Sequence, residues 1–293
     1  MMSPDRLDPG PASAGPLRAH PAFRSAMLRS AAGLTGLYQG NRLLNRLLND
    51  RGRAVMGFLA LYLDALGRAE PRHPGLTTNG IKALFARMRL CSPGRAAAML
   101  AVMRVAGYVA VLPTPVGADR RLRRLQPTER LVAIHLARWR VQFEAIGLVV
   151  PALARIAPRL DERPFRDRFV IDLVGRRLAG SAIIEAAPGL ELFAERDAGV
   201  MILFSLIMAD AGGDAAPVSV SALSRRFGVS RAHVGKLLQD AAAAGLLERR
   251  EEGAVRLLPA LVDATEEFFA TAFATLIQAA EAALDGERLA VAS

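Results

Sequence analysis

The chain has 293 residues, which corresponds to about two average domains. Because 52% of the residues are hydrophobic, a sizeable core is expected and wholesale disorder is excluded. The 38 basic residues exceed the 28 acidic ones by ten, and only Lys82 and Lys236 among them are lysines. Such a charge indicates an anionic partner, either nucleic acid or a membrane surface. The single cysteine, Cys91, excludes an internal disulfide framework and a cysteine-rich zinc site.

The sequence shows no targeting or membrane signal. Residues 1–21 are rich in proline, glycine and alanine and hold no apolar stretch as long as that of a signal peptide. The longest uncharged apolar run, residues 198–209, is too short to span a bilayer. We therefore expect a cytoplasmic protein that does not contact a membrane.

Periodicity and capping signals predict a mainly helical chain that follows a flexible arm over residues 1–37. In the first half, helices are expected at 38–50, 53–66, 78–88, 92–107, 128–146 and 165–178, with β-like residues at 108–112. In the second half, helices are expected at 197–211, 219–227, 230–245 and 263–284, with strands at 246–250 and 254–258. This order predicts a first domain over 38–150, a helical connector over 151–196 and a second domain over 197–293.

The sharpest motif lies at residues 220–246 and is typical of a helix-turn-helix. Such a motif needs an apolar inner face on both helices and a tight turn between them. Leu223 and Phe227 supply the first inner face, and Gly228 allows the turn. The second inner face consists of Val234, Leu237 and Leu238, which leaves Ser230, Arg231, His233 and Lys236 to point outward. The hairpin after Gly245 adds a wing, so the pattern predicts a winged helix-turn-helix.

The first half repeats this motif at a distance of 138 residues. Ser92 precedes Ser230, and Gly107 precedes Gly245, by that same number. Phe85 then takes the place of Leu223, and Leu100 that of Leu238. We therefore expect a mainly α fold with small β wings: two winged helix-turn-helix units joined by helices, and a long C-terminal helix.

The first unit also resembles the wing of MarR-type transcriptional regulators. The resemblance is carried by Gly107-Tyr108-Val109, by Asp119-Arg120-Arg121, and by Leu125 with Thr128. It covers residues 53–146 and, more loosely, 197–285. It implies a cytoplasmic regulator that binds operator DNA, often as a dimer, and that in some members releases DNA when a small-molecule effector binds. A homodimer through helices and an effector are therefore expected partners besides double-stranded DNA.

The basic residues gather on the predicted DNA-binding units. Residues 87–140 hold eleven arginines and two acids, and residues 218–257 hold seven basic and four acidic residues. The candidate DNA contacts of the first unit are Ser92, Arg95, Arg120, Arg121, Arg123 and Arg124. Those of the second unit are Ser230, Arg231, His233, Lys236, Arg249 and Arg250. We hypothesise that the first unit supplies most of the affinity and the second more of the sequence choice.

No pattern for enzymatic chemistry is evident. The four histidines lie far apart in the sequence, and neither a nucleotide-binding glycine pattern nor a nucleophile motif is present. We therefore expect no enzyme, no metal and no cofactor. The preferred function is sequence-specific binding of double-stranded DNA by a transcriptional regulator. Two alternatives stay open: a plasmid-type replication initiator with tandem winged helices, and a winged-helix protein-interaction module without a DNA role.

Overall fold

The computed structural model describes residues 13–38, 51–113, 123–179, 187–211, 218–250 and 254–292. The chain forms two compact units that are not contiguous in sequence. Unit 1 comprises residues 1–51, 140–157 and 182–277, and unit 2 comprises residues 52–139, 158–181 and 278–293. The expected contiguous domains therefore differ from these units. The reason is that the helices spanning residues 129–146 and 259–292 each contribute residues to both units.

The mainly helical fold with small wings is confirmed. In the first half the elements are α1 (Ala14–Ala19), α2 (Phe23–Leu37), α4 (Arg51–Ala69), α5 (Thr78–Arg87), α6 (Pro93–Val105), β1 (Val109–Val111), β2 (Leu125–Pro127) and α7 (Glu129–Ile146). The middle helices are η1 (Pro151–Arg155), α8 (Ile156–Arg159), α9 (Arg163–Leu178), η2 (Pro188–Leu190) and α10 (Glu191–Ala194). The last elements are α11 (Gly199–Asp210), α12 (Val220–Phe227), α13 (Arg231–Ala243), β3 (Leu247–Arg249), β4 (Val255–Leu257) and α14 (Pro259–Ala292).

In unit 2, α5, α6, β1 and β2 follow in the order of a winged helix-turn-helix. Thr77 caps α5, because its side chain accepts a hydrogen bond from the N–H of Gly80, and Ser92 caps α6 in the same way. β1 and β2 pair antiparallel, with Val109 opposite Pro127. Leu76 bridges to Leu125 of β2, so the chain segment before α5 extends the small sheet.

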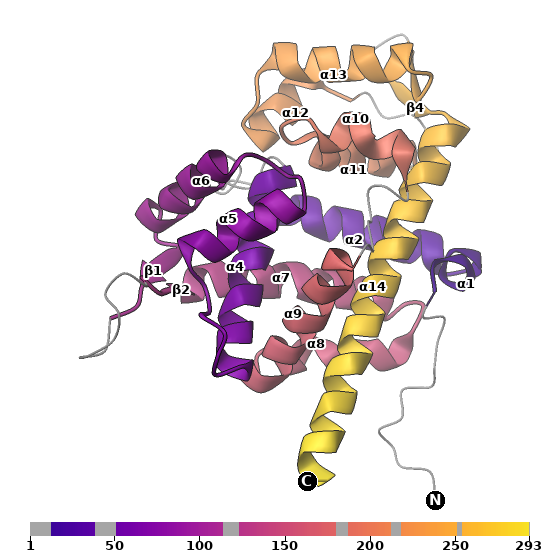
Figure 1. Ribbon diagram of the computed structural model, residues 1–293. Helices are drawn as coiled ribbons and strands as arrows, with labels where there is room; N and C mark the ends of the chain where they lie inside the picture. Colours follow the sequence, from indigo (N-terminus) through magenta and orange to yellow (C-terminus); the bar gives the residue numbers. More distant parts are fainter. Residues whose placement is uncertain are drawn as a thin grey trace, which may run out of the picture. The chain divides into compact units, whose positions relative to one another are not determined.

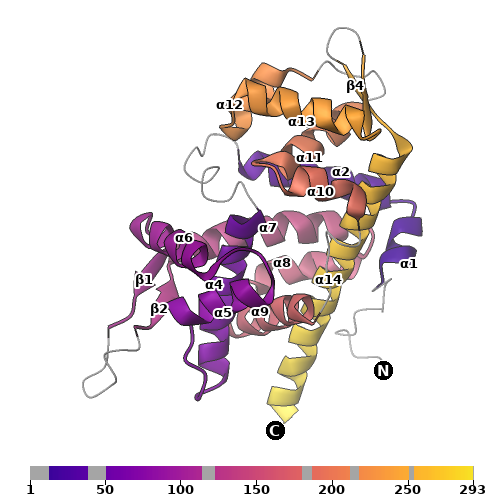
Figure 2. The same cartoon turned by 45° about the horizontal axis from the view of Figure 1, so that its top comes forward.

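In unit 1, α11, α12, α13, β3 and β4 follow in the same order. Ser219 caps α12 and Ser230 caps α13, as the sequence predicts. Gly228, in the turn between the two helices, has a φ of 69°, which residues with a Cβ rarely adopt. Figure 1 and Figure 2 both show α12 and α13 lying on α10 and α11 within this unit. The inner residues of the motif, Leu223, Phe227, Val234, Leu237 and Leu238, are all buried.

The expectation of a flexible arm over residues 1–37 is wrong for the residues from 13 onward. These form α1 and α2, and α2 packs on α11 (Figure 1). Phe23 is buried and meets Phe273 of α14 with ring centroids 6.2 Å apart. Arg18 of α1 forms ion pairs with Asp263 at 2.7 Å and Glu266 at 2.9 Å. Burial of apolar side chains therefore holds this segment in unit 1.

The repeat of 138 residues holds for α6 and α13 but not for the helices before them. Residues 88–92 connect α5 to α6, whereas the shorter stretch 228–230 connects α12 to α13. Phe85 and Phe227 are each the last buried residue of their helix, so Phe85 matches Phe227 in place and not Leu223. The expected helix at 38–50 lies outside the described residues, apart from Tyr38.

Candidate nucleic-acid interface

The start of α13 is a capped helix terminus with an exposed arginine. The Ser230 hydroxyl accepts a hydrogen bond from the N–H of His233 at 3.0 Å, which fixes the first turn. Arg231 follows at the first helical position with an exposed side chain. The exposed and half-exposed residues after it share one face of the helix: Ala232, Gly235, Lys236 and Gln239. This face therefore combines the polar side chains of Lys236 and Gln239 with the small residues Ala232 and Gly235.

His233 does not point outward with its neighbours, which corrects the expectation from sequence. Its Nε2 lies 2.9 Å from the backbone carbonyl oxygen of Asp197, in the turn before α11. Because the carbonyl can only accept, Nε2 carries the proton in this contact. His233 therefore anchors the first turn of α13 to the rest of unit 1.

Lys236 is exposed but not isolated. Its Nζ lies 2.8 Å from Asp240, and the same carboxylate pairs with Arg196 at 3.0 Å. The hydrogen bond from Lys236 is the main reason that the pKa of Asp240 lies below its usual value. Asp240 thus ties α13 to the segment before α11, as His233 does nearer the start of the helix. The two contacts hold the recognition-type helix from the same side.

The wing of unit 1 contains arginines in two different settings. Arg249 on β3 and Arg250 beyond it are exposed. Arg256 on β4 lies opposite Glu248 in the antiparallel register and pairs with it at 2.7 Å. This difference makes Arg249 and Arg250 the wing residues with charge to offer an anion, while Arg256 stabilises the hairpin.

Gln239 is a candidate that the sequence motif alone did not single out. It lies two turns beyond Arg231 on α13 and is exposed. A glutamine amide can donate and accept at once, which suits the paired donor and acceptor of an adenine edge. The spacing in the sequence could have found it, since Gln239 follows Lys236 by three positions and so shares its face.

The candidate DNA contacts of the first winged helix-turn-helix, which lies in unit 2, are more scattered. Ser92 is the exposed cap of α6, and Arg95 lies exposed in its first turn. Arg123 is exposed just before β2. Arg124 instead donates to the backbone carbonyls of Pro74 at 2.9 Å and of His73 at 3.2 Å. Arg120 and Arg121 lie outside the described residues.

Three arginines of the basic stretch donate to backbone carbonyls and keep their charge. Besides Arg124, Arg87 donates to Leu178 and Arg130 donates to Ala106 at the end of α6. A carbonyl carries no net charge, so these bonds fix the guanidinium groups without neutralising them. The first winged helix-turn-helix therefore keeps a positive field even where its arginines have structural roles.

The outward faces of α6 and α13 differ in chemistry. Because the two helices start at Pro93 and Arg231, positions along them correspond one to one. Where α13 has Lys236, Gln239 and Asp240, α6 has Ala98, Ala101 and Val102. The two helices therefore do not present the same kind of surface.

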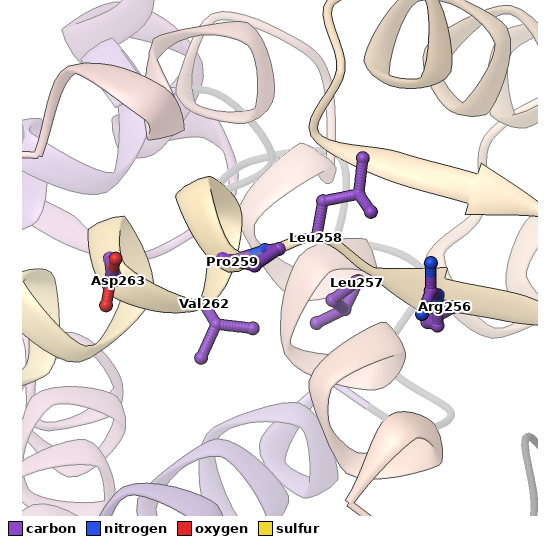
Figure 3. A pocket seen from close by; sticks show the side chains of 6 residues that line it. All are labelled: Arg256, Leu257, Leu258, Pro259, Val262 and Asp263. Carbon is purple, nitrogen blue, oxygen red and sulfur yellow. The ribbon is translucent and has the colours of Figure 1, made fainter.

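A shallow pocket of about 480 Å³ lies where the wing of unit 1 meets α14 (Figure 3). Its lining comes from the end of β4 and the first turns of α14: Arg256, Leu257, Leu258, Pro259, Val262 and Asp263. Both charged residues already have ion-pair partners, Glu248 for Arg256 and Arg18 for Asp263. The pocket thus presents no free charge to a ligand, and the expected effector stays a prediction.

Within the described ranges, no helix has the length and apolarity needed to cross a membrane. In the same part of the chain, no group of three or more His, Cys, Asp or Glu side chains could hold a metal ion. Comparison of the chain with protein-family models, with curated proteins and with solved structures finds no match.

Proposed function

We propose that the chain binds double-stranded DNA in a sequence-specific way and acts as a transcriptional regulator. The observation that carries the proposal is the exposed face of α13, on which Arg231 and Gln239 lie beside small residues and beside Lys236, which is paired with Asp240. Arginine and lysine are suited to the guanine edge and glutamine to the adenine edge in the major groove. Ala232 and Gly235 allow the helix backbone to come close to the bases.

The anchoring of α13 supports the same proposal. A helix that reads base edges must keep its orientation when the groove closes around it, because readout depends on the direction of each hydrogen bond. The contacts of His233 with Asp197 and of Asp240 with Arg196 meet this requirement. The exposed arginines of the wing, Arg249 and Arg250, are placed after the helix in the chain, where a wing contacts the phosphate backbone.

The first winged helix-turn-helix, which contains α5 and α6 and lies in unit 2, contributes mainly charge under this proposal. Its α6 offers few base-edge donors, whereas Arg87, Arg124 and Arg130 donate to uncharged carbonyls and keep their positive charges. Non-specific attraction to phosphates is the part of DNA binding that such charges supply. Sequence choice is then assigned to the second winged helix-turn-helix, which contains α13 and lies in unit 1.

A selection experiment tests the proposal. The purified full chain is mixed with fragmented genomic DNA at about 150 mM salt, where non-specific binding is weak, and the bound duplexes are sequenced. The proposal expects one enriched motif upstream of genes. Enrichment of a repeated motif at a single replication origin would favour the replication initiator instead. The absence of any enriched motif would overturn sequence-specific binding.

A matched variant keeps this result tied to α13. Arg231→Ala should lose the enrichment, because Arg231 has an exposed side chain at the start of the helix. Arg256→Ala should keep it, since Arg256 pairs with Glu248 within the wing. Loss of enrichment in both variants, with both still folded by circular dichroism, would contradict the assignment of readout to α13.

A further inference from the structure

α6 is apolar on two sides, and only one of them is covered by the fold. Its buried side holds Ala96, Leu100 and Met103. The second apolar stripe consists of Ala98, Ala101, Val102 and Val105, which follow one another at helical spacing and are all exposed. An apolar stripe on a surface helix normally faces a packing partner, and the outward stripe of α6 has none within the described residues.

The exposure of this stripe is unusual within the chain. Among the described residues, Val105 is 92% exposed and Val102 is 53% exposed. Both belong to the small set of large hydrophobic side chains that remain exposed, and they lie one turn apart on one helix. Figure 1 and Figure 2 show α6 lying beside α5.

The charges around the stripe select the partner. From residue 87 to residue 112 the sequence contains four arginines and no acidic residue. Two of these, Arg95 and Arg104, lie exposed on α6 itself, and Arg130 donates to the carbonyl of Ala106 just after its last turn at 3.1 Å. An apolar stripe between positive charges is complementary to an amphipathic helix with acidic flanks.

We propose that the outward face of α6 binds an acidic amphipathic helix of a partner protein. The face does not suit a second copy of α6, because two copies would bring like charges together without any acid between them. It also does not suit base readout, since its residues have no hydrogen-bonding ends. The proposal concerns a different helix from α13 and does not depend on DNA binding by α13.

A designed peptide serves as the probe. It is a fluorescein-labelled helical peptide with leucines at positions i, i+3, i+4 and i+7 and glutamates on both flanks. Two control peptides have the same residues in scrambled order, or lysines in place of the glutamates. The full chain should bind the first peptide in the range of about 10–100 μM, with an affinity that falls as salt is added, and should bind both controls at least about tenfold more weakly.

Variants place the binding on α6. Val102→Gln together with Val105→Gln should weaken binding of the acidic peptide at least about tenfold, and both side chains are exposed enough for the fold to tolerate the change. Arg104→Glu should weaken it too, by reversing a flanking charge. Leu148→Gln, which alters an exposed apolar side chain on another segment, is the matched control and should leave binding unchanged.

Five results would overturn the proposal. The first two are that the acidic peptide does not bind, and that it binds no better than its controls. The other three concern the double valine variant and self-association. The double valine variant binds it as well as the wild type does. The wild type self-associates in sedimentation and the double variant does not, which would make a second copy the occupant. The double variant loses DNA affinity as Arg231→Ala does, which would make the face a nucleic-acid surface.

Discussion

Gly57 of α4 lies directly against the imidazole of His135 of α7, so that a Cβ at position 57 would overlap Nε2 of the ring. His135 is buried, and neither of its ring nitrogens has a hydrogen-bond partner within the described part of the chain. The ring instead lies among aromatic side chains, 4.4 Å from Phe58 and 5.6 Å from Trp139 between centroids. The core of unit 2 thus holds a neutral histidine without a polar partner.

This burial makes the protein sensitive to acid. Burial, with a smaller contribution from Arg138, lowers the pKa of His135 to about 3. In the unfolded chain a histidine has a pKa of about 6.5. As the pH falls below that value, His135 is protonated in the unfolded chain but stays neutral in the folded chain. The free energy of unfolding therefore falls by up to about 1.4 kcal/mol per pH unit. Urea unfolding between about pH 7.5 and 5 measures this slope.

His135→Leu isolates the contribution of this one group. Leucine is apolar and close to histidine in size, so the variant should be at least as stable at neutral pH and lose less stability on acidification. The wild type and the variant share all other titrating groups, and the difference between their slopes belongs to position 135. Equal slopes in the two proteins would contradict the buried, neutral state of His135.

A pair of glycine substitutions tests the packing around this ring. Gly57→Ala should destabilise unit 2 by about 1–3 kcal/mol, because the added methyl group must displace the His135 ring. Gly175→Ala, within α9, meets nothing within 4 Å and should stabilise the helix by up to about 1 kcal/mol. Thermal unfolding of both variants gives the comparison. A gain in stability for Gly57→Ala would contradict the close approach of α4 to the His135 ring.

The wing of unit 1 gives a second matched pair. Arg249→Ala should reduce the dependence of DNA affinity on salt by about one unit in the slope of log K against log salt, as expected when one phosphate is no longer neutralised. Arg256→Ala should leave that slope unchanged, because its guanidinium pairs with Glu248. Titration of a labelled duplex at several salt concentrations reports the slope. The same slope for wild type and Arg249→Ala would remove this arginine from the interface.

Arg120 and Arg121 carry a prediction that rests on sequence alone, since they lie outside the described residues. Replacing both by alanine should flatten the salt slope by about one unit for each phosphate that is no longer neutralised. Arg124→Ala is a useful contrast, because Arg124 is fixed to the carbonyls of His73 and Pro74 and should affect the stability of unit 2 as well. An unchanged slope in the double variant would mean that these two arginines are not at the DNA.

Local signals in the sequence predicted much of the fold. The sequence predicts Ser92 and Ser230 as caps and Gly228 as the turn, because each of these features depends on residues within one or two turns of the helix. The proline and glycine residues of the first 21 positions favour a loose arm, although Phe23, Met27 and Leu34 of α2 lie at helical spacing, and the burial that holds Phe23 comes from α14.

The orientation of single side chains could not be predicted in the same way. His233 turns toward the carbonyl of Asp197, and Arg124 toward those of His73 and Pro74. These partners are distant in sequence, and a backbone carbonyl leaves no trace in the residue type. Helical spacing therefore placed His233 on an outward face, whereas tertiary contact decides where its ring lies.

Sequence-specific recognition by α13 is the central claim, and one measurement tests it most directly. Fluorescence anisotropy compares the Kd for the selected duplex with the Kd for a scrambled duplex of the same composition, for wild type and for Arg231→Ala. At about 150 mM salt the wild type should prefer the selected duplex by about a thousandfold or more, and Arg231→Ala should lose most of that preference. Equal Kd values of the wild type for the two duplexes would contradict the claim.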